Sequence, residues 1–410
     1  MSDTESCIRL AVVSPFLDKR HGTERAVVEW LSHLPERFEI HIYSQRVEQM
    51  DRSRYTLHKI PKLPGPHLLN FLWWIVANPI WRWFDAVFRG ARYDIVYSPG
   101  ANCLNADALS VHIVFAEYRK KVAPQVSFSS NPLRLWPVIL HRRLFYALAA
   151  ALERRTYDDR GAELILYARK TGDEITRHYG RPGPFPILYL GLDHSTFNPQ
   201  RRGQIRSEAR RTLAISQDQF VLLLVGNDWR NKGLPVLVRA LAKLPELPVH
   251  LLVTTTEKIS SCRELISSYG MIERVRFLPP RVDVEFYYAA ADAYAGPSLE
   301  DTFALPPAEA MACGLPVIVS SANGTSEIIT DETDGLVLRD PQDSVSLAAM
   351  IRRLVTDCSF SEHLGNNAAQ TMLRFTWEKN GQDLAKIFDG IIARKRGHST
   401  QTLAPESRTC

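Results

Sequence analysis

The stretch from Gln219 to Leu244, QFVLLLVGNDWRNKGLPVLVRALAKL, contains a complete strand–turn–helix unit. Its first eight residues form a nearly continuous apolar run ending at Gly226, which predicts a buried strand. From Gly233 onward the apolar residues recur on one side of a helix. This order is typical of a doubly wound parallel sheet, in which the turn after a strand lies at the edge that binds ligands.

The same rhythm of strand, glycine turn and helix opens the chain. Ile8 to Ser14 reads as a buried strand, Gly22 follows it, and Arg25 to Leu34 has the apolar spacing of a helix. Other segments with strand character are 38–43, 93–98, 109–115, 163–167, 186–190, 249–253, 274–278, 293–295 and 316–320. Strands alternating with helices predict an α/β protein with parallel sheets.

The chain is too long, at 410 residues, for one compact core, so we expect two domains. Apolar residues make up 45% and charged residues 23%, as in ordinary globular proteins. A net charge of +5 is too small to indicate a nucleic-acid partner. The polar, turn-rich segment Asn198 to Gly203 is the predicted linker, which places the N-terminal domain at 1–200.

The cysteines and the N-terminus bear on the compartment. Six cysteines are scattered without CxxC spacing, which indicates neither a zinc site nor a disulfide framework. Reduced thiols are typical of a cytoplasmic protein. The N-terminal MSDTESC has no apolar core, so we expect no secretory signal.

The loop from Gly226 to Gly233, GNDWRNKG, is the first candidate for chemistry. It joins a strong strand to a strong helix, whose N-terminus would offer free N–H groups and a positive dipole end. Arg230 and Lys232 add formal charge there. A diphosphate suits this combination, although a Lys-Gly pair at a helix start is often only a solvated cap.

The second candidate is Pro297 to Pro316, PSLEDTFALPPAEAMACGLP. Glu300 and Asp301 precede an apolar helix, and Glu309 lies within that helix, where carboxylates are seldom placed unless paired or liganded. Asp301 and Glu309 could accept hydrogen bonds from sugar or ribose hydroxyls, and N–H groups near Phe303, Ala304 and Leu305 could face a phosphate. The alternative is an exposed glutamate and a helix-capping aspartate.

These segments together resemble the signature of the retaining family 4 glycosyltransferases, which have the GT-B fold. The match is close from Glu309 to Val317 (EAMACGLPV), and 301–304 (DTFA) stands where Glu-Gly-Phe-Gly is usual. Supporting similarities lie at 191–193 with 197–199, at 323–327, at 334–336 and at 375–378. The family fold is α/β, with two Rossmann-like domains facing across a cleft and a C-terminal helix that crosses back to the N-terminal domain.

The resemblance implies a domain plan. It gives a C-terminal nucleotide-sugar domain at 201–374 and a returning helix at 375–396. The polar composition of 397–410 predicts a disordered tail. The resemblance also implies that Lys232, helped by Arg230, neutralises the donor diphosphate. Asp301 would touch the transferred sugar, and Glu309 would hold the ribose.

In the N-terminal domain the resemblance implies that Gly22 lets a ligand approach the backbone and that His112 lines the reaction centre. From the residues alone, a histidine in the apolar strand LSVHIVF reads as a satisfied core residue. The sequence departs from the family at Asn227, where an arginine is usual, and at Asp301, where a glutamate is usual. Arg230 and Glu300 are the candidates to take over those two roles.

The implied function is transfer of a hexose-type sugar from a UDP- or GDP-sugar to a hydroxyl of a glycan or lipid-linked acceptor, with retention of configuration. No Asp-x-Asp motif is present, and we expect no metal and no other cofactor. Alternatives are a catalytically silent nucleotide-sugar-binding protein of the same fold, or another GT-B enzyme such as an epimerase. A dinucleotide dehydrogenase is disfavoured because no GxGxxG follows a strand.

Two segments of the N-terminal half have the composition of a membrane interface. Residues 67–88 are rich in tryptophan and phenylalanine, and 119–152 is basic and contains no Asp or Glu. The longest apolar run, 68–80, is too short to span a bilayer. We expect peripheral attachment to an anionic inner membrane face; the alternative is a buried amphipathic helix and a basic loop.

Overall fold

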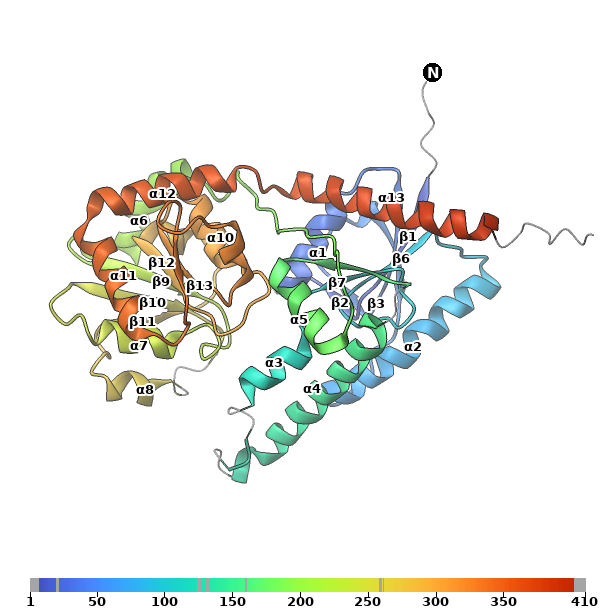
Figure 1. The fold of residues 1–410 in the computed structure, drawn as a ribbon, viewed down its shortest axis with the longest axis horizontal. Helices are drawn as coiled ribbons and strands as arrows, with labels where there is room; N and C mark the ends of the chain where they lie inside the picture. The colour runs from blue at the N-terminus through green and yellow to red at the C-terminus, as the bar shows by residue number, and fades with distance from the viewer. Residues whose placement is uncertain are drawn as a thin grey trace, which may run out of the picture. The chain divides into compact units, whose positions relative to one another are not determined.

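A computed structural model of the chain describes residues 7–19, 22–123, 127–129, 133–158, 161–257, 260 and 262–401. The chain forms two compact units, shown as a ribbon in Figure 1. Unit 1 consists of Met1–Tyr189 and Trp377–Cys410, and unit 2 of Leu190–Thr376.

Unit 1 is built on a six-stranded parallel sheet with the order β5-β3-β1-β6-β7-β8. Its strands are β1 (Ile8–Val13), β3 (Phe38–Ser44), β5 (Tyr55–Lys59), β6 (Ile95–Pro99), β7 (Ala108–Val111) and β8 (Glu163–Leu166). Leu10 of β1 pairs with Ile40 on one side and Ile95 on the other, so the strand order reverses beside β1. A short parallel pair, β2 (Phe16–Leu17) and β4 (Arg46–Val47), follows β1 and β3.

Helices cover both faces of this sheet (Figure 1). They are α1 (Gly22–Ser32), α2 (His67–Phe88), α3 (Phe115–Val122), α4 (Trp136–Tyr157), α5 (Arg169–Tyr179) and α13 (Trp377–Gln401), with 3-10 turns at Arg52–Arg54 and Leu133–Leu135. Ala11 and Val13 pack with Trp74 of α2. On the other face Phe388 of α13 packs against Phe38 and Tyr97. Alternation along β1 therefore buries both of its faces, which explains its continuous apolar run.

The C-terminal helix α13 belongs to unit 1, as the resemblance implied. Trp30 of α1 donates to Asn380 at 3.3 Å, and Asn380 donates to the carbonyl of Tyr189 at 2.9 Å. Near the other end of α13, three consecutive basic residues pair with acidic residues at the amino ends of the sheet strands: Arg394 with Glu163, Lys395 with Asp107 and Arg396 with Asp94.

Unit 2 contains a second six-stranded parallel sheet, ordered β11-β10-β9-β12-β13-β14. Its strands are β9 (Phe220–Val225), β10 (Val249–Thr254), β11 (Val275–Leu278), β12 (Ala293–Gly296), β13 (Val317–Ser320) and β14 (Leu336–Leu338). Its helices are α6 (Pro199–Thr212), α7 (Leu234–Leu241), α8 (Arg263–Ser268), α9 (Glu285–Ala290), α10 (Leu305–Ala312), α11 (Ser344–Thr356) and α12 (Cys358–Met372), with a 3-10 turn at Gly324–Ile328. The predicted α/β class with two Rossmann-like domains is confirmed.

Three sequence predictions differ from the structure. The predicted linker at Asn198 is the start of α6, because the Asn198 side chain caps the helix by accepting from the Arg201 N–H and Pro199 fits its first turn. The units divide at 189/190, whereas we predicted 200/201. The strand predicted at 109–115 ends at Val111, since Phe115 already begins α3.

A fourth difference concerns the predicted tail. Helix α13 continues to Gln401, so 397–401 are helical where we expected disorder; the rest of that prediction, 402–410, lies outside the described residues.

Gly381 provides a test of how α13 docks on α1. A β-carbon at Gly381 would lie 2.2 Å from the carbonyl oxygen of His33. Gly381→Ala should therefore lower the free energy of unfolding by about 1–3 kcal/mol, measured by urea denaturation. In the same helix, a β-carbon at Gly390 meets only Arg394 at 3.8 Å, so Gly390→Ala should be neutral or stabilising by up to about 1 kcal/mol. Equal effects of the two substitutions would contradict this docking.

Candidate functional site

In unit 2, two loops at the carboxyl edge of the sheet are joined together. The loop 226–233 follows β9, and the loop 297–301 follows β12. Asn231 donates to the carbonyl of Glu300 at 2.8 Å, and the Leu299 N–H donates to the carbonyl of Asn231 at 2.7 Å. Gly233 has φ +89°, and a β-carbon there would lie 2.3 Å from the Pro297 carbonyl oxygen. Only glycine permits this approach.

The joined loops bring Lys232 and Asp301 together. The Lys232 ammonium nitrogen lies 2.5 Å from Asp301 Oδ2, and about a fifth of each side chain is exposed. The lysine stem packs against Gly226, where a β-carbon would lie 3.1 Å from Lys232 Cε. A cation and a carboxylate that reach solvent at the carboxyl edge of a parallel sheet can contact a phosphate and a hydroxyl of one ligand.

Arg230 and Asn227 do not join this pair. The Arg230 guanidinium lies 4.0 Å above the Trp229 ring and lines a cavity of about 560 Å³ that Lys232 does not line. Asn227 Oδ1 accepts hydrogen bonds from Thr255 Oγ1, the Thr256 N–H and Thr256 Oγ1 at 2.8–3.2 Å. Asn227 thus joins the ends of β9 and β10, and the predicted helper Arg230 is separated from Lys232.

The start of helix α10 offers fewer donors than we expected. The Ala304 N–H is already bonded to Asn323 Oδ1 at 3.3 Å and to Thr325 Oγ1 at 3.0 Å. Pro306 and Pro307 in the first turn have no N–H at all. Leu305 is then the one residue of that turn whose N–H could face an anion. Phe303, Ala304 and Leu305 are all buried, with 6–8% exposed.

The carboxylates Glu300 and Glu309 are both buried, with 6% and 3% exposed. Glu309 Oε2 accepts a hydrogen bond from the hydroxyl of Tyr288, on α9, at 2.7 Å. The buried phenol of Tyr294 lies within electrostatic range of both Asp301 and Glu309, and together with burial these carboxylates raise its pKa. The structure therefore gives Glu309 a hydroxyl partner in Tyr288.

Unit 1 has a cavity of about 560 Å³ at the carboxyl edge of its sheet. Residues that directly follow four parallel strands line it: 14–16 after β1, 45–46 after β3, 99–102 at the end of β6 and 112–113 after β7. Thr23 and Glu24 in the first turn of α1 also line it. Gly22 precedes them, and a β-carbon there would meet nothing within 4 Å. This edge of the sheet is where such folds bind ligands.

His112 lies in the wall of this cavity, just beyond β7. Its Nε2 lies 3.0 Å from Ser110 Oγ and 3.3 Å from the Tyr167 hydroxyl, and its Nδ1 has no hydrogen-bond partner among the described residues. Burial lowers the pKa of His112 to about 3. The imidazole is therefore neutral near pH 7, and it can accept or donate a hydrogen bond to a ligand but carries no charge.

Glu153, on α4, also lines the cavity and was not predicted. Both of its oxygens accept from the Phe115 N–H at 2.9 Å, and Oε2 accepts from the Tyr179 hydroxyl at 2.6 Å. Burial raises the pKa of Glu153 to about 7, against the lowering effect of these hydrogen bonds. An acid inside the apolar helix 144–157 was a signal for it, as it was for Glu309. No comparable signal pointed to Tyr288.

Residues 205–371 match the family model described as "Glycosyl transferases group 1". A curated relative named D-inositol 3-phosphate glycosyltransferase, from Salinispora tropica, is 31% identical over 253 residues, which are 57% of this chain and 52% of the relative. The chain thus spans about half the length of the curated relatives it matches.

Two solved structures share the fold over most of the chain. WaaG, described as a glycosyltransferase involved in lipopolysaccharide biosynthesis, has a TM-score of 0.76 at 23% identity and covers 93% of this chain and 100% of its own. Anabaena HepE in complex with UDP-glucose has a TM-score of 0.69 at 18% identity, covering 93% and 100%. At these identities the similarity establishes the fold.

The raised pKa of Glu153 predicts a pH dependence of stability. Because burial raises the pKa of the folded Glu153 carboxyl from its usual 4.5 to about 7, stability falls as pH rises from 4.5 to 7, by about 3 kcal/mol in total. Glu153→Gln should remove this fall, so the variant should gain stability relative to the native chain between pH 5 and pH 8. Urea denaturation at pH 5 and at pH 8 measures this gain in stability, with Glu208→Gln, at an exposed position, as a matched control. A constant difference across this range would contradict the assignment.

Proposed function

Because residues 205–371 match the glycosyl transferases group 1 family model, we propose that the chain transfers a sugar from a nucleotide-diphosphate donor to an acceptor hydroxyl. One observation carries the proposal. Lys232 and Asp301 are paired at 2.5 Å at the carboxyl edge of the unit 2 sheet, on loops held by Asn231 and Gly233.

Lys232, Asp301 and Glu309 would contact different parts of the donor. The diphosphate would take Lys232 from Asp301, which frees the Asp301 carboxylate to accept a hydrogen bond from the transferred sugar. Glu309 would hold the ribose hydroxyls, in competition with its present partner Tyr288. Glu300 and Glu309, with 6% and 3% exposed, would both need a change of side-chain position to reach a ligand. Asp301 is about a fifth exposed, which favours it over Glu300 as the sugar contact.

In the reaction the acceptor oxygen forms a bond to the anomeric carbon, and the bond from that carbon to the phosphate oxygen breaks. The nucleoside diphosphate leaves with the electron pair, and the hydroxyl proton passes to it or to solvent. Lys232 and the Leu305 N–H would stabilise the charge that develops on the leaving oxygen. Retention of configuration and independence of metal are proposed from the family resemblance. The proposed donor is a UDP- or GDP-sugar; the similar structure of HepE is a complex with UDP-glucose.

In unit 1, the cavity lined by His112, with the backbone at Gly22, would bind the acceptor. The acceptor would be a glycan or a lipid-linked hydroxyl. The curated relatives are named for inositol 3-phosphate, which is also a hydroxyl-bearing acceptor. A catalytically silent donor-binding protein or an epimerase of the same fold would retain the Lys232–Asp301 pair and would transfer nothing.

Activity of the purified protein separates these functions. With UDP- and GDP-hexoses, Lys232→Ala should lower the rate of donor hydrolysis or transfer by at least about 100-fold, the usual cost of removing one stabilising contact to the leaving group. Glu309→Ala should raise KM for the donor more than it lowers kcat, because ribose contacts persist from substrate to transition state. Exposed Lys243 gives the matched control, Lys243→Ala, with native activity. Binding without turnover in the native protein would indicate the silent alternative.

We also propose that unit 1 attaches peripherally to an anionic cytoplasmic membrane face through 67–88 and 119–152. One side of α2 exposes six apolar side chains at a spacing of three or four residues, each between 42% and 61% exposed: Leu69, Leu72, Val76, Ile80, Trp83 and Val87. We call this row the outer stripe. Its helix continues through Pro79 without a break. Such a solvent-facing apolar row is typical of an interfacial helix.

Helix α4 adds a second exposed apolar surface, with Leu140 and Leu144 each 50% exposed. By length and composition alone, Leu133–Tyr157 is long and apolar enough to cross a membrane, and 11% of its most apolar 18-residue window is buried. This helix was not singled out from the sequence as a candidate span. Its inner side contacts the rest of unit 1 through Glu153 and Phe145, which favours a helix that lies along the interface. Arg142 and Arg143 on α4 are exposed and can face anionic headgroups.

Vesicle flotation tests the attachment. The native chain should float with phosphatidylcholine vesicles that contain phosphatidylglycerol, and binding should weaken as salt rises. Val76→Glu on the outer stripe should reduce binding strongly, because it places a charge in the interface. Val345→Glu, at an exposed apolar position on α11, should leave binding unchanged. Failure of the native chain to float at low salt would disprove the attachment.

A further inference from the structure

The unit 1 cavity has two chemically different ends. At the carboxyl ends of the strands its wall is polar, with Ser14, Thr23 and His112. Away from the strands its wall is formed by apolar and aromatic side chains of two helices: Phe71 and Trp74 of α2 with Phe145, Ala149 and Leu152 of α4. A cavity of about 560 Å³ lies in the size range of pockets that enclose a small ligand, about 300–1,000 Å³.

The helices that form the apolar end are apolar on two sides. On α2 the cavity contacts fall at 67, 70, 71 and 74, and on α4 at 145, 149, 152 and 153, the spacing of one helical face. The outer stripe of α2 begins at 69 on the opposite side of the helix. Each helix thus separates the cavity from an apolar surface by only its own thickness, about 10 Å.

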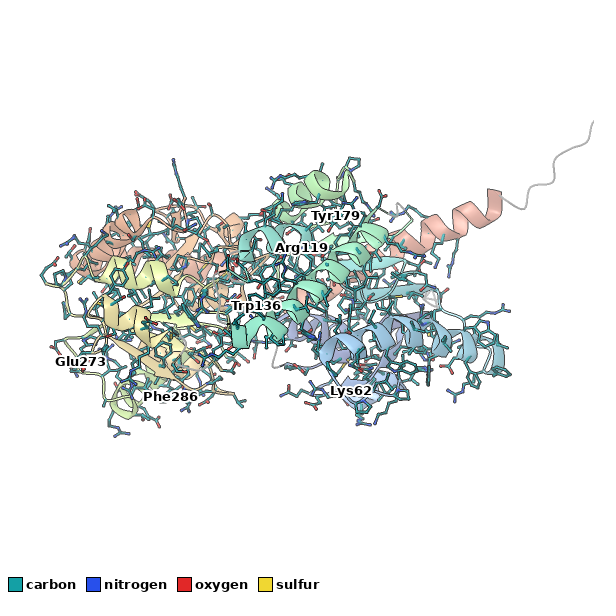
Figure 2. The ribbon with its side chains drawn as sticks, turned by 90° about the horizontal axis from the view of Figure 1, so that it is seen from below. Lys62, Arg119, Trp136, Tyr179, Glu273 and Phe286 are labelled. Carbon is teal, nitrogen blue, oxygen red and sulfur yellow. The ribbon has the colours of Figure 1, made fainter. Side chains whose placement is uncertain are left out.

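At the start of α2, exposed Lys62 and His67 line the cavity. Asn70 and Gln45 exchange hydrogen bonds between their amides at 3.1 and 3.3 Å, which joins the beginning of α2 to the end of β3. Phe71 and His67 meet Phe145 with ring centroids 5.5 and 5.0 Å apart. The rim is therefore aromatic and basic. Figure 2 shows Lys62 ahead of α2 and Trp136 at the start of α4, seen from below.

The segment of the polypeptide around the start of α2 is basic. No Asp or Glu occurs between Arg52 and Phe84, and the basic residues of that stretch are Arg52, Arg54, Lys59, Lys62 and Arg82. Arg46 in the cavity wall is 51% exposed and pairs with two carboxylates, Asp18 at 3.0 Å and Glu48 at 3.7 Å, and Glu24 also lines the cavity. Cations beside an apolar entrance suit a molecule that comes from an anionic lipid surface.

We propose that the unit 1 cavity binds an amphiphile drawn from such a surface, with its hydroxyl-bearing head at the carboxyl ends of the strands beside His112 and its apolar chain between α2 and α4. That this amphiphile is the acceptor of sugar transfer rests on the proposed function. Binding of the amphiphile depends on unit 1 alone and can be measured without a donor.

At the apolar end of the cavity, the free energy of binding favours an alkyl chain of the ligand over a second polar group. Phe71, Phe145 and Leu152 offer no hydrogen-bonding atom in their side chains, so a hydroxyl placed among them would lose its water without compensation. Each buried methylene instead contributes favourably, enough for about a fourfold gain in affinity. Affinity should therefore increase with chain length until the chain fills the space between α2 and α4.

Calorimetric titration with hexyl, heptyl and octyl β-glucoside, each below its critical micelle concentration and without nucleotide sugar, tests the proposal. We expect about a fourfold tighter Kd for each added methylene, and no measurable binding of methyl glucoside. A Kd that does not change with chain length, or no binding of any of the three, would overturn it.

Three variants test where the alkyl chain of the ligand binds. Ala149→Phe fills the apolar end and should abolish the gain with chain length; Phe71→Asn, at a half-buried position that tolerates a polar residue, should reduce it even if the first variant folds poorly. Trp83→Glu on the outer stripe should leave the gain intact. If Trp83→Glu removes it and Phe71→Asn does not, the chain binds the outer surface and the proposal is wrong.

Binding of UDP or GDP to the same preparations is a separate measurement. Alkyl glucoside binding without nucleotide binding would overturn the proposed function alone, and the reverse result would overturn this inference alone.

Discussion

The contact between Gly233 and the carbonyl of Pro297 is the constraint on which the unit 2 site depends. No side chain fits at position 233, because its β-carbon would lie 2.3 Å from that oxygen. The close approach lets Asn231 bond to the loop after β12, and it places Lys232 against Asp301. Residues 69 positions apart in sequence thus become an ion pair at the carboxyl edge of the sheet, where their charge can meet a ligand.

Much of this arrangement could be predicted from the sequence. The apolar run 220–225 followed by a glycine-bounded loop predicted β9 and its carboxyl edge, and Lys232 and Asp301 were singled out with their neighbours. Alternation of strands and helices predicted two parallel sheets. These features are local patterns, and local patterns are what a single sequence carries.

Other features depend on contacts between distant residues and could not be read from the sequence. Arg230 has the charge for a phosphate, but the neighbouring Trp229 ring holds its guanidinium at 4.0 Å. The start of α10 resembled an anion site, yet Asn323 and Thr325, about 20 residues further along the chain, already use the Ala304 N–H. Asn198 was misread as part of a linker because a polar Asn-Pro pair is equally suited to a turn and to a helix cap.

In unit 1 the main ambiguity of the sequence lay in α2. A helix that is apolar all round is consistent with a buried core helix or with an interface helix. The structure assigns Trp74 and Ala77 to the core and leaves the outer stripe exposed. It also reveals the cavity between α2 and α4, whose wall combines residues from widely separated parts of unit 1. The same helix therefore has a face that packs in the core and an exposed apolar face.

The central claim, that unit 2 binds a nucleotide-sugar donor through Lys232, is tested most directly by thermal unfolding with UDP, GDP, ADP and their hexose conjugates. One base should raise the unfolding midpoint, with a stabilisation of about 2.7 kcal/mol at a hundred times Kd. The shift should vanish in Lys232→Ala and persist in Lys243→Ala. A midpoint that none of these ligands changes at millimolar concentration, or a shift of equal size in Lys232→Ala, would contradict the account.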